Sequence, residues 1–251
     1  MRGLTAMDEH RIEAAAGRLV AARRAGQRVQ LSPEETPRDF TEGFALQDAV
    51  AAQLGQRPIG WKLLVPDGTV VFAPILASDE VPVGGTWRVH GGQPAGIEVE
   101  IAYRMGATVP ATATLEQVLD AVASAHVVFE LCQSRLADPA NVPRHVGLAD
   151  SVSNAGVVVG DAIPGWRKKD MRQIPGRLNV DGKVHMEGKS VDPVHILSLV
   201  PAALASRGKK LETGQVIITG SLVGMNWLDG SHDLEGVIEG CGRVACRLEA
   251  V

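Results

Sequence analysis

After residue 59 the chain runs as a long series of short β-branched segments separated by glycine, proline and aspartate, and this pattern limits its fold more than any other. Apolar runs of this kind between turn residues are typical of strands. Asp181-Gly182 lies between two of them and is a strong signal for a tight hairpin. Only two helical segments, 114–122 and 192–207, interrupt the series. They are too few for a regular alternation of strand and helix, so the sequence predicts an α+β fold.

The N-terminal part of the chain has helical periodicity instead. Apolar residues recur at helical spacing in 7–25, and Gly26 is placed to end that helix. The segment 41–54 repeats this pattern and is followed by Gly55. We therefore expect a helical N-terminal region, residues 1–58, followed by a β-rich catalytic domain, residues 59–251.

Charge and composition argue against several classes of partner. The 251 residues carry a formal net charge of −4, and the basic residues form no patch or stripe, so nucleic-acid binding is not expected. No apolar run approaches the roughly 20 residues of a membrane helix, and the first residues lack the apolar core of a signal peptide. The three cysteines have no C-x-x-C spacing, which argues against a disulfide framework and favours a cytoplasmic location.

Three glutamates stand in apolar strand-like runs. Glu98 and Glu100 alternate within 96–105, so their side chains share one face of the predicted strand. Glu130 lies in a second apolar run, where an ionised carboxylate needs a partner. A nearby arginine or lysine would serve, and so would a cation. All-oxygen ligands suit Mg²⁺ or Mn²⁺. The alternative is a half-exposed strand with one solvated face.

Two further residues are candidates for substrate binding. Lys62 lies in the apolar run 59–65, where it either extends its ammonium to water or points into a cavity to bind an anionic substrate or move a proton. Ser221 ends the run 216–221, where free amide donors at a strand end can receive a carboxylate. A plain turn explains the second pattern equally well.

Several other catalytic motifs do not occur. The seven histidines form no H-x-x-x-H pair, and the H-x-E at 185–187 has no P-C-x-x-C partner, so zinc protease and deaminase chemistry are disfavoured. The sequence has neither the dinucleotide-binding nor the P-loop glycine pattern. The serine in 220–224 is misplaced for a nucleophile elbow.

Taken in order, the motifs of the chain resemble a known family. They are G-W-K at 60–62, E-x-E at 98–100, E-L at 130–131, D-x-x-x-N-A-G-V-V-x-G at 150–160 and I-I-T-G-S at 217–221. This order and spacing resemble the 2-keto-4-pentenoate hydratase family of the fumarylacetoacetate hydrolase superfamily, over roughly residues 10–250. The family includes hydratases of 2-hydroxydienoates and of 2-oxohept-4-ene-1,7-dioate, and the related 4-oxalocrotonate decarboxylases.

The resemblance implies a fold, a cofactor and a set of site residues. The fold would be a mixed β-roll preceded by helices. Glu98, Glu100 and Glu130 would hold Mg²⁺ or Mn²⁺, Lys62 would orient the substrate carboxylate or relay a proton, and Ser221 would lie near that carboxylate. The substrate would be a small 2-oxo acid, the assembly a homo-oligomer, and the setting the catabolism of aromatic compounds.

The activity implied is that of a metal-dependent hydro-lyase acting on an unsaturated 2-oxo or 2-hydroxydienoic acid through a metal-stabilised enolate. The alternatives are C–C bond hydrolysis of an acylpyruvate-like compound, decarboxylation of a 2-oxo acid, and a degenerate scaffold that only binds a ligand or partner. Hydrolysis would need a water-activating acid or histidine, and His126 and His145 lie nearby in the sequence.

Two departures from the family pattern concern the substrate rather than the metal. The family's P-D-Y/F-G stretch falls on 70–76, which has no aspartate, and that acid is expected to help in proton transfer. The family's E-[IL]-[IV]-D becomes Glu130-Leu131-Cys132-Gln133, in which an amide replaces a charged residue. Both departures indicate a divergent member with a substrate of its own.

Overall fold

The computed structural model describes residues 7–65, 68–90 and 92–251, which divide into two compact units. Unit 1 combines Met1–Arg57 with Gln133–Asn154, and unit 2 combines Pro58–Cys132 with Ala155–Val251. The sequence-based division at residue 58 placed 133–154 with the second part, whereas these residues group with the N-terminal helices. Whether either unit folds as an independent domain remains a prediction.

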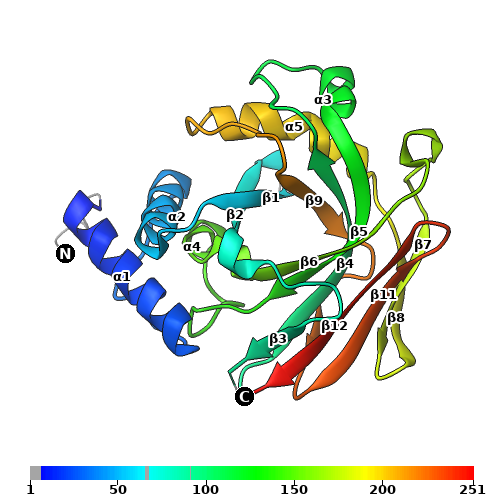
Figure 1. The fold of residues 1–251 in the computed structure, drawn as a ribbon. Coiled ribbons are helices and arrows are strands. Elements are labelled where there is room, and N and C mark those ends of the chain that lie inside the picture. Colours follow the sequence, from blue (N-terminus) through cyan, green and yellow to red (C-terminus); the bar gives the residue numbers. More distant parts are fainter. Residues whose placement is uncertain (1–6, 66–67, 91) are drawn as a thin grey trace. The chain divides into compact units, whose positions relative to one another are not determined.

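Unit 1 is built from helices α1 (Glu9–Ala25), α2 (Phe40–Leu54) and α4 (Arg144–Ala149), with a short 3-10 turn, η3 (Ser151–Ser153) (Figure 1). Asp8 and Asp39 cap the first two helices through their carboxylates. Gly26 and Gly55 end them in the left-handed conformation that glycine adopts without strain. The two helices predicted from periodicity are therefore confirmed.

A buried ion pair organises the segment 133–154 of unit 1. The guanidinium of Arg135 pairs with the Asp150 carboxylate, which also accepts a hydrogen bond from the Ser134 hydroxyl at 2.7 Å. Arg135 further donates to the carbonyl oxygens of Gln133 at 2.5 Å and Asn154 at 2.9 Å. Leu136 and Val146 of this segment join the apolar core that α1 and α2 form.

The first sheet of unit 2 contains the predicted carboxylate strands. Its order is β2 (Val71–Leu76), β1 (Pro58–Leu64), β9 (Val216–Ser221), β4 (Ala95–Met105), β5 (Val122–Cys132) and β6 (Asn154–Ala162), with β10 (Asn226–Leu228) also paired to β4. β1 and β9 are parallel, whereas β4 is antiparallel to β5, β9 and β10. Mixed strand directions match the prediction of an α+β fold.

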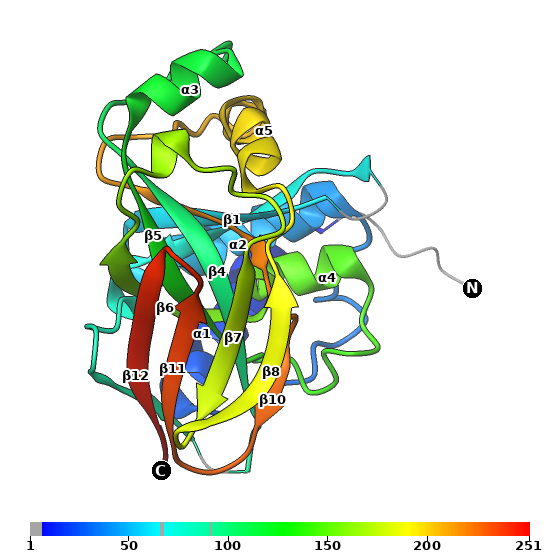
Figure 2. The same cartoon turned by 90° about the vertical axis from the view of Figure 1, so that its right-hand side faces the viewer.

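The second sheet of unit 2 has the order β3 (Thr86–Val89), β12 (Gly242–Ala250), β11 (His232–Ile238), β7 (Pro175–Val180) and β8 (Lys183–Lys189). β7 and β8 form the predicted hairpin, in which Asp181 and Gly182 both have positive φ. Figure 2 shows this sheet lying in front of β4 and β5. Gly236 permits the contact, because a Cβ there would come within 2.8 Å of Phe129 and 3.1 Å of Val99.

Helices α3 (Leu115–Ala121) and α5 (Pro193–Ala205) lie at one end of unit 2 (Figure 1). Thr114 and Gln117 form the capping box expected from the sequence, and Asp192 caps α5 ahead of a proline in its first turn. Short 3-10 turns, η2 (Ala77–Asp79) and η4 (Trp166–Lys168), complete the unit. In the part of the chain that the structure describes, no helix is long and apolar enough to cross a membrane.

Acid should weaken unit 1 through Glu42 of α2. This buried carboxylate pairs with Arg38 and accepts hydrogen bonds from the backbone amides of Met7 at 3.0 Å and Arg38 at 2.9 Å. The Arg38 guanidinium is the main cause that lowers the Glu42 pKa to about 2. A carboxylate with a lowered folded pKa contributes stability above its unfolded pKa of about 4.3 and loses it as the pH falls toward the folded value.

We therefore expect Glu42→Gln to lower the free energy of unfolding by about 1 to 2 kcal/mol at pH 7, a figure reduced because Arg38 is partly exposed. The deficit should shrink as the pH falls from 4.5 to 3.5, which urea unfolding at each pH would measure. Glu34→Gln, at an exposed position of the same unit, is the matched control. A deficit that stays constant across this pH range would contradict the assignment.

Candidate active site

The register of the first sheet brings the three predicted carboxylates to one face. Glu98 of β4 lies directly opposite Glu130 of β5. Glu100, two residues along β4, lies opposite Val128 of β5 and Ser221 of β9. Directly paired residues project from the same face of a sheet, and residues two apart in one strand do the same. The face-sharing predicted for Glu98 and Glu100 therefore extends across strands to Glu130.

Glu98, Glu130 and Cys132 form the tightest acidic cluster in the described chain. One potential ligand atom of each lies within 4.8 Å of the others. Glu130 and Cys132 are buried and Glu98 is partly exposed. Cys132 is a member that the motif analysis missed. It stands two residues after Glu130 in one strand, so the same alternation that placed Glu98 beside Glu100 would have placed it on this face.

Glu100 is held differently from the other two glutamates. It is buried, and its Oε2 accepts a hydrogen bond from the backbone amide of Gly220 at 2.7 Å. The sequence suggested that amide donors at the end of β9 would receive a substrate carboxylate. In the structure, the Gly220 amide instead donates to the carboxylate of Glu100. Gly220 has φ +108°, a conformation that favours glycine and orients this donor.

Lys62 enters the same face from β1 and is the partner of Glu130. Its Nζ lies 2.5 Å from Oε1 of Glu130, and both side chains are buried. Burial opposes the charge on the ammonium, but the neighbouring Glu130, Cys132 and Glu98 outweigh it and raise the Lys62 pKa. The lysine is therefore a buried cation, which excludes the interpretation in which its ammonium extends to water.

The cluster holds more acidic groups than Lys62 can neutralise. Burial and the charge of Glu130 raise the Glu98 pKa to about 7, although Lys62 and the Ser221 hydroxyl act in the opposite direction. Burial, Glu130 and Glu98 raise the pKa of Glu100 as well. Mutual repulsion of buried carboxylates has this effect, and a bound cation relieves it. The residues present therefore fit a divalent cation at this face.

Ser221 lies beside the carboxylates but has competing acceptors. Its hydroxyl donates to the carbonyl oxygen of Gly224 at 3.0 Å, and it also contacts Glu98 closely enough to lower the pKa of that carboxyl group. The single hydroxyl proton can serve only one acceptor at a time. Ser221 is thus placed at the edge of the cluster, where a bound anion would compete for the same proton.

The two histidines considered for water activation are engaged elsewhere. The His126 ring contacts the Ser124 hydroxyl at 2.8 Å and the Gly160 carbonyl oxygen at 3.1 Å. His145 belongs to unit 1, where its ring packs edge-on against Phe40. The segment expected to carry the family's aspartate forms β2, whose six residues from Val71 to Leu76 are all buried and uncharged.

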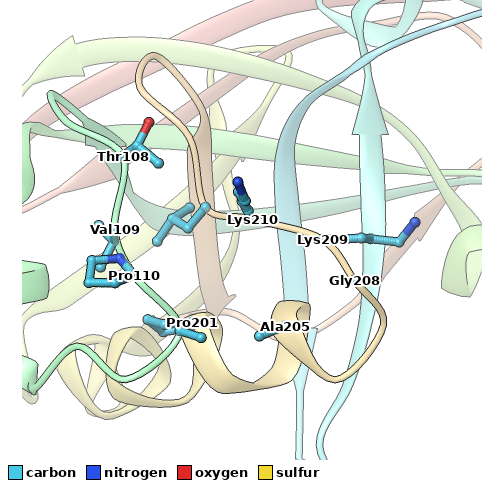
Figure 3. Close-up of a pocket in the computed structure, with 10 residues that line it drawn as sticks. Thr108, Val109, Pro110, Pro201, Ala205, Gly208, Lys209 and Lys210 are labelled. Carbon is cyan, nitrogen blue, oxygen red and sulfur yellow. The ribbon is translucent and has the colours of Figure 1, made fainter.

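A separate hollow of about 580 Å³ lies between the turn after β4 and the end of α5 (Figure 3). Thr108, Pro110, Pro201, Lys209 and Lys210 are among the residues that line it. No carboxylate, histidine or cysteine is among its lining residues, so it offers neither metal ligands nor a general base. The three glutamates that the sequence predicted as metal ligands lie on the acidic face of β4 and β5 and not in this hollow.

Comparison with known proteins adds an independent observation. No known family profile matches the chain. The 2-keto-4-pentenoate hydratase of Paraburkholderia phymatum is 26% identical over an alignment of 259 residues, which covers 94% of this chain and 97% of that protein. The resemblance to the 2-keto-4-pentenoate hydratase family is confirmed. The chain is thus similar to this hydratase over nearly its whole length.

Solved structures share its fold. The 4-oxalocrotonate decarboxylase of Pseudomonas putida G7, complexed with magnesium and adipate, superposes with a TM-score of 0.84 at 18% identity over 96% of this chain and 98% of that chain. A putative fumarylpyruvate hydrolase from Burkholderia cenocepacia gives a TM-score of 0.59 at 19% identity, over 77% and 85% of the two chains. The predicted mixed β-roll with a helical N-terminal part is thereby confirmed.

The Lys62–Glu130 pair can be tested through stability without any substrate. Lys62→Met leaves Glu130 buried without its cation, and breaking a buried pair in this way costs about 3 to 5 kcal/mol. Adding Glu130→Gln should restore part of that loss. Urea unfolding of both single variants and the double variant, with a chelator present, gives the coupling. Lys183→Met, at an exposed position of β8, is the control. Additive losses in the double variant would show that the two charges do not interact.

Proposed function

We propose that this protein is a divalent-metal-dependent hydro-lyase that acts on a small unsaturated 2-oxo or 2-hydroxydienoic acid. The observation that carries the proposal is the convergence of Glu98 and Glu130 on one sheet face beside the buried cation Lys62. A cluster of buried acids with raised pKa values and one lysine suits a dication and an anionic substrate better than it suits a structural core.

Glu98, Glu100 and Glu130 are the proposed ligands of the cation. Burial and Glu130 raise the pKa of the Cys132 thiol, so the thiol stays neutral at pH 7 and is a poor ligand for a hard cation. Carboxylate ligands favour Mg²⁺ or Mn²⁺. When bound, the cation supplies positive charge next to the 2-oxo group, where negative charge develops during proton shifts along the substrate chain.

Lys62 and Ser221 are the proposed substrate-binding residues. The Lys62 ammonium is charged and buried beside the cluster, so it can attract the substrate carboxylate. Its second proposed role, to relay a proton at Nζ, would require a bound cation to offset the acidic neighbours that raise its pKa. The Ser221 hydroxyl can turn from Gly224 to a bound carboxylate, because it needs only to exchange one acceptor for another. Both groups lie on the face that bears the metal ligands, so they would position the acid end of the substrate.

Decarboxylation of a 2-oxo acid is the second candidate. It is favoured by the absence of an acid from β2, since hydration needs a group there to help in proton transfer and decarboxylation releases carbon dioxide without adding water. The likeness to 4-oxalocrotonate decarboxylase supports it through the fold alone. C–C bond hydrolysis of an acylpyruvate-like compound is less well supported, because His126 is engaged by Ser124 and Gly160.

Further proposals follow from the family. We propose a homo-oligomer located in the cytoplasm, with a role in aromatic compound catabolism and with neither nucleic acid nor membrane as a partner. Sedimentation velocity of the purified chain tests the assembly.

Metal binding and turnover should fail together in ligand variants. Glu98→Gln and Glu130→Gln should weaken Mg²⁺ binding in calorimetry by about 100-fold or more, since even residues that only support metal ligands are worth about 10- to 100-fold. Glu187→Gln, at an exposed position of β8, is the matched control. Thermal unfolding would verify that each variant is folded. Turnover that persists in the presence of a chelator would overturn the proposal.

The reaction itself is decided by a side-by-side assay. A 2-hydroxydienoate, a 2-oxo-hexenedioate and an acylpyruvate would be supplied with Mg²⁺, and products would be identified by mass. Water addition to the first compound is the expected result. Release of carbon dioxide from the second, with no reaction of the first, would assign the chain to decarboxylation.

A further inference from the structure

Two apolar side chains at the start of β10, Met225 just before the strand and Trp227 within it, lie next to the acidic cluster. We propose that Met225 and Trp227 bind the far end of the substrate and select a 2-oxo acid with an apolar tail over one with a second carboxylate. This inference rests on the proposed function, because the acid end of the substrate must lie at Glu98 and Glu130 for the tail to reach β10.

The strand register places Trp227 on the acidic face. Trp227 pairs with Gly96 from one side of β4, and Cys132 pairs with Gly96 from the other. Glu98 follows Gly96 by two residues in β4 and so projects from the same face. Trp227, Gly96 and Cys132 therefore form one row across the sheet, adjacent to the row that contains Glu98 and Glu130.

The contacts above Gly96 confirm this placement. A Cβ added to Gly96 would lie 2.5 Å from Met225 Sδ, 3.0 Å from the Cβ of Cys132 and 3.0 Å from a ring carbon of Trp227. The side chains of Met225, Cys132 and Trp227 thus converge over Gly96, which has no side chain of its own. Cys132 is itself within 4.8 Å of the Glu98 and Glu130 carboxylates. Met225 and Trp227 therefore form an apolar wall at the Gly96 side of the cluster.

A buried amide fixes the orientation of this wall. Asn226, between the two apolar residues, is buried and pairs with Ile97, so it occupies the opposite face of the sheet. Its Nδ2 donates to the carbonyl oxygen of Gly224 at 2.9 Å. Because side chains alternate along the strand, anchoring Asn226 on one face directs Met225 and Trp227 to the other.

Exposure and charge indicate what the wall binds. Met225 is 38% exposed and Trp227 48% exposed, although they adjoin side chains that are almost fully buried. A large apolar surface beside a concave polar site is the usual composition of a ligand pocket. The segment 222–230 contains no lysine or arginine, and its one charged residue is Asp229. A tail carboxylate would find no cation there and would meet negative charge, whereas an alkyl or aryl tail would bury apolar area.

The test compares three metal-bound probes that share a 2-oxo acid head. They are 2-oxobutyrate with a short tail, 4-methyl-2-oxopentanoate with a branched apolar tail, and 2-oxoadipate with a carboxylate tail. Calorimetry with the Mg²⁺-loaded full chain should show 4-methyl-2-oxopentanoate binding about 10-fold more tightly than 2-oxobutyrate, and 2-oxoadipate binding no more tightly than 2-oxobutyrate. Binding of the branched probe should also shift the tryptophan emission to shorter wavelength.

Three variants assign the preference to the wall. Trp227→Ala and Met225→Ala should each bring the ratio of the dissociation constants of 2-oxobutyrate and 4-methyl-2-oxopentanoate toward one. Trp227→Phe should abolish the shift in tryptophan emission but keep most of the preference for the branched probe. Met186→Ala is the matched control, since Met186 is 43% exposed on β8 of the second sheet. It should leave both the ratio and the shift unchanged.

The outcomes separate this inference from the proposed function. Binding of 2-oxobutyrate only with Mg²⁺, and its loss in Glu98→Gln, would support the proposed function. If, in that case, the two probes bind equally well to the unaltered protein, or the preference for the branched probe survives Trp227→Ala, the wall does not bind the tail. If Trp227→Ala changes the sedimentation coefficient and leaves the ratio intact, the wall is a subunit contact and the inference is overturned. If no probe binds in a metal-dependent way, both proposals fall.

Discussion

Buried negative charge governs this structure more than any other interaction. Glu98, Glu100 and Glu130 share one sheet face with a single buried cation, Lys62, whose Nζ lies 2.5 Å from Glu130. Burial first, and then the charge of the neighbouring Glu130, raise the pKa of Glu98 to about 7. An arrangement of this kind is costly for folding alone. The proposed dication and anionic substrate would complete the charge balance and offset this cost.

The fold holds this face by packing the opposite face of the same strands. Val99 and Phe129 project away from the carboxylates and meet Gly236 of the second sheet, where the missing side chain permits close approach. Because side chains alternate along β4 and β5, an apolar face that is fixed in this way fixes the acidic face as well. The positions of the site residues therefore depend on a register that the apolar core enforces.

The departures from the pattern of the hydratase family leave the three glutamates that are proposed as metal ligands in place. The acid expected near 70–76 is absent from β2, whereas Met225 and Trp227, at the start of β10, lie beside the cluster. An enolate chemistry applied to a substrate with a different tail would need such a charge arrangement together with a different lining. In the proposed assignment, β1, β4, β5 and β9 carry the residues that bind the acid end of the substrate. Met225 and Trp227, at the start of β10, bind the remainder.

The sequence determined the local features because each depends on neighbours along the chain. Helix ends at Gly26 and Gly55, the hairpin at Asp181-Gly182 and the shared face of Glu98 and Glu100 all follow from backbone conformation and strand alternation. The family motifs extended this reading to Glu130 and Lys62 by resemblance.

Only the tertiary structure decided which partner each group has. Alternation gives the face of a residue but not the register between strands. Contacts between strands therefore depend on pairings across as many as 120 positions of sequence. They include the Lys62–Glu130 pair, the hydrogen bond from Gly220 to Glu100 and the place of Cys132 in the cluster. The grouping of 133–154 with the N-terminal helices has the same origin, since Arg135 and Asp150 are brought together by burial rather than by any local pattern. Long-range packing, and not propensity, sets these contacts.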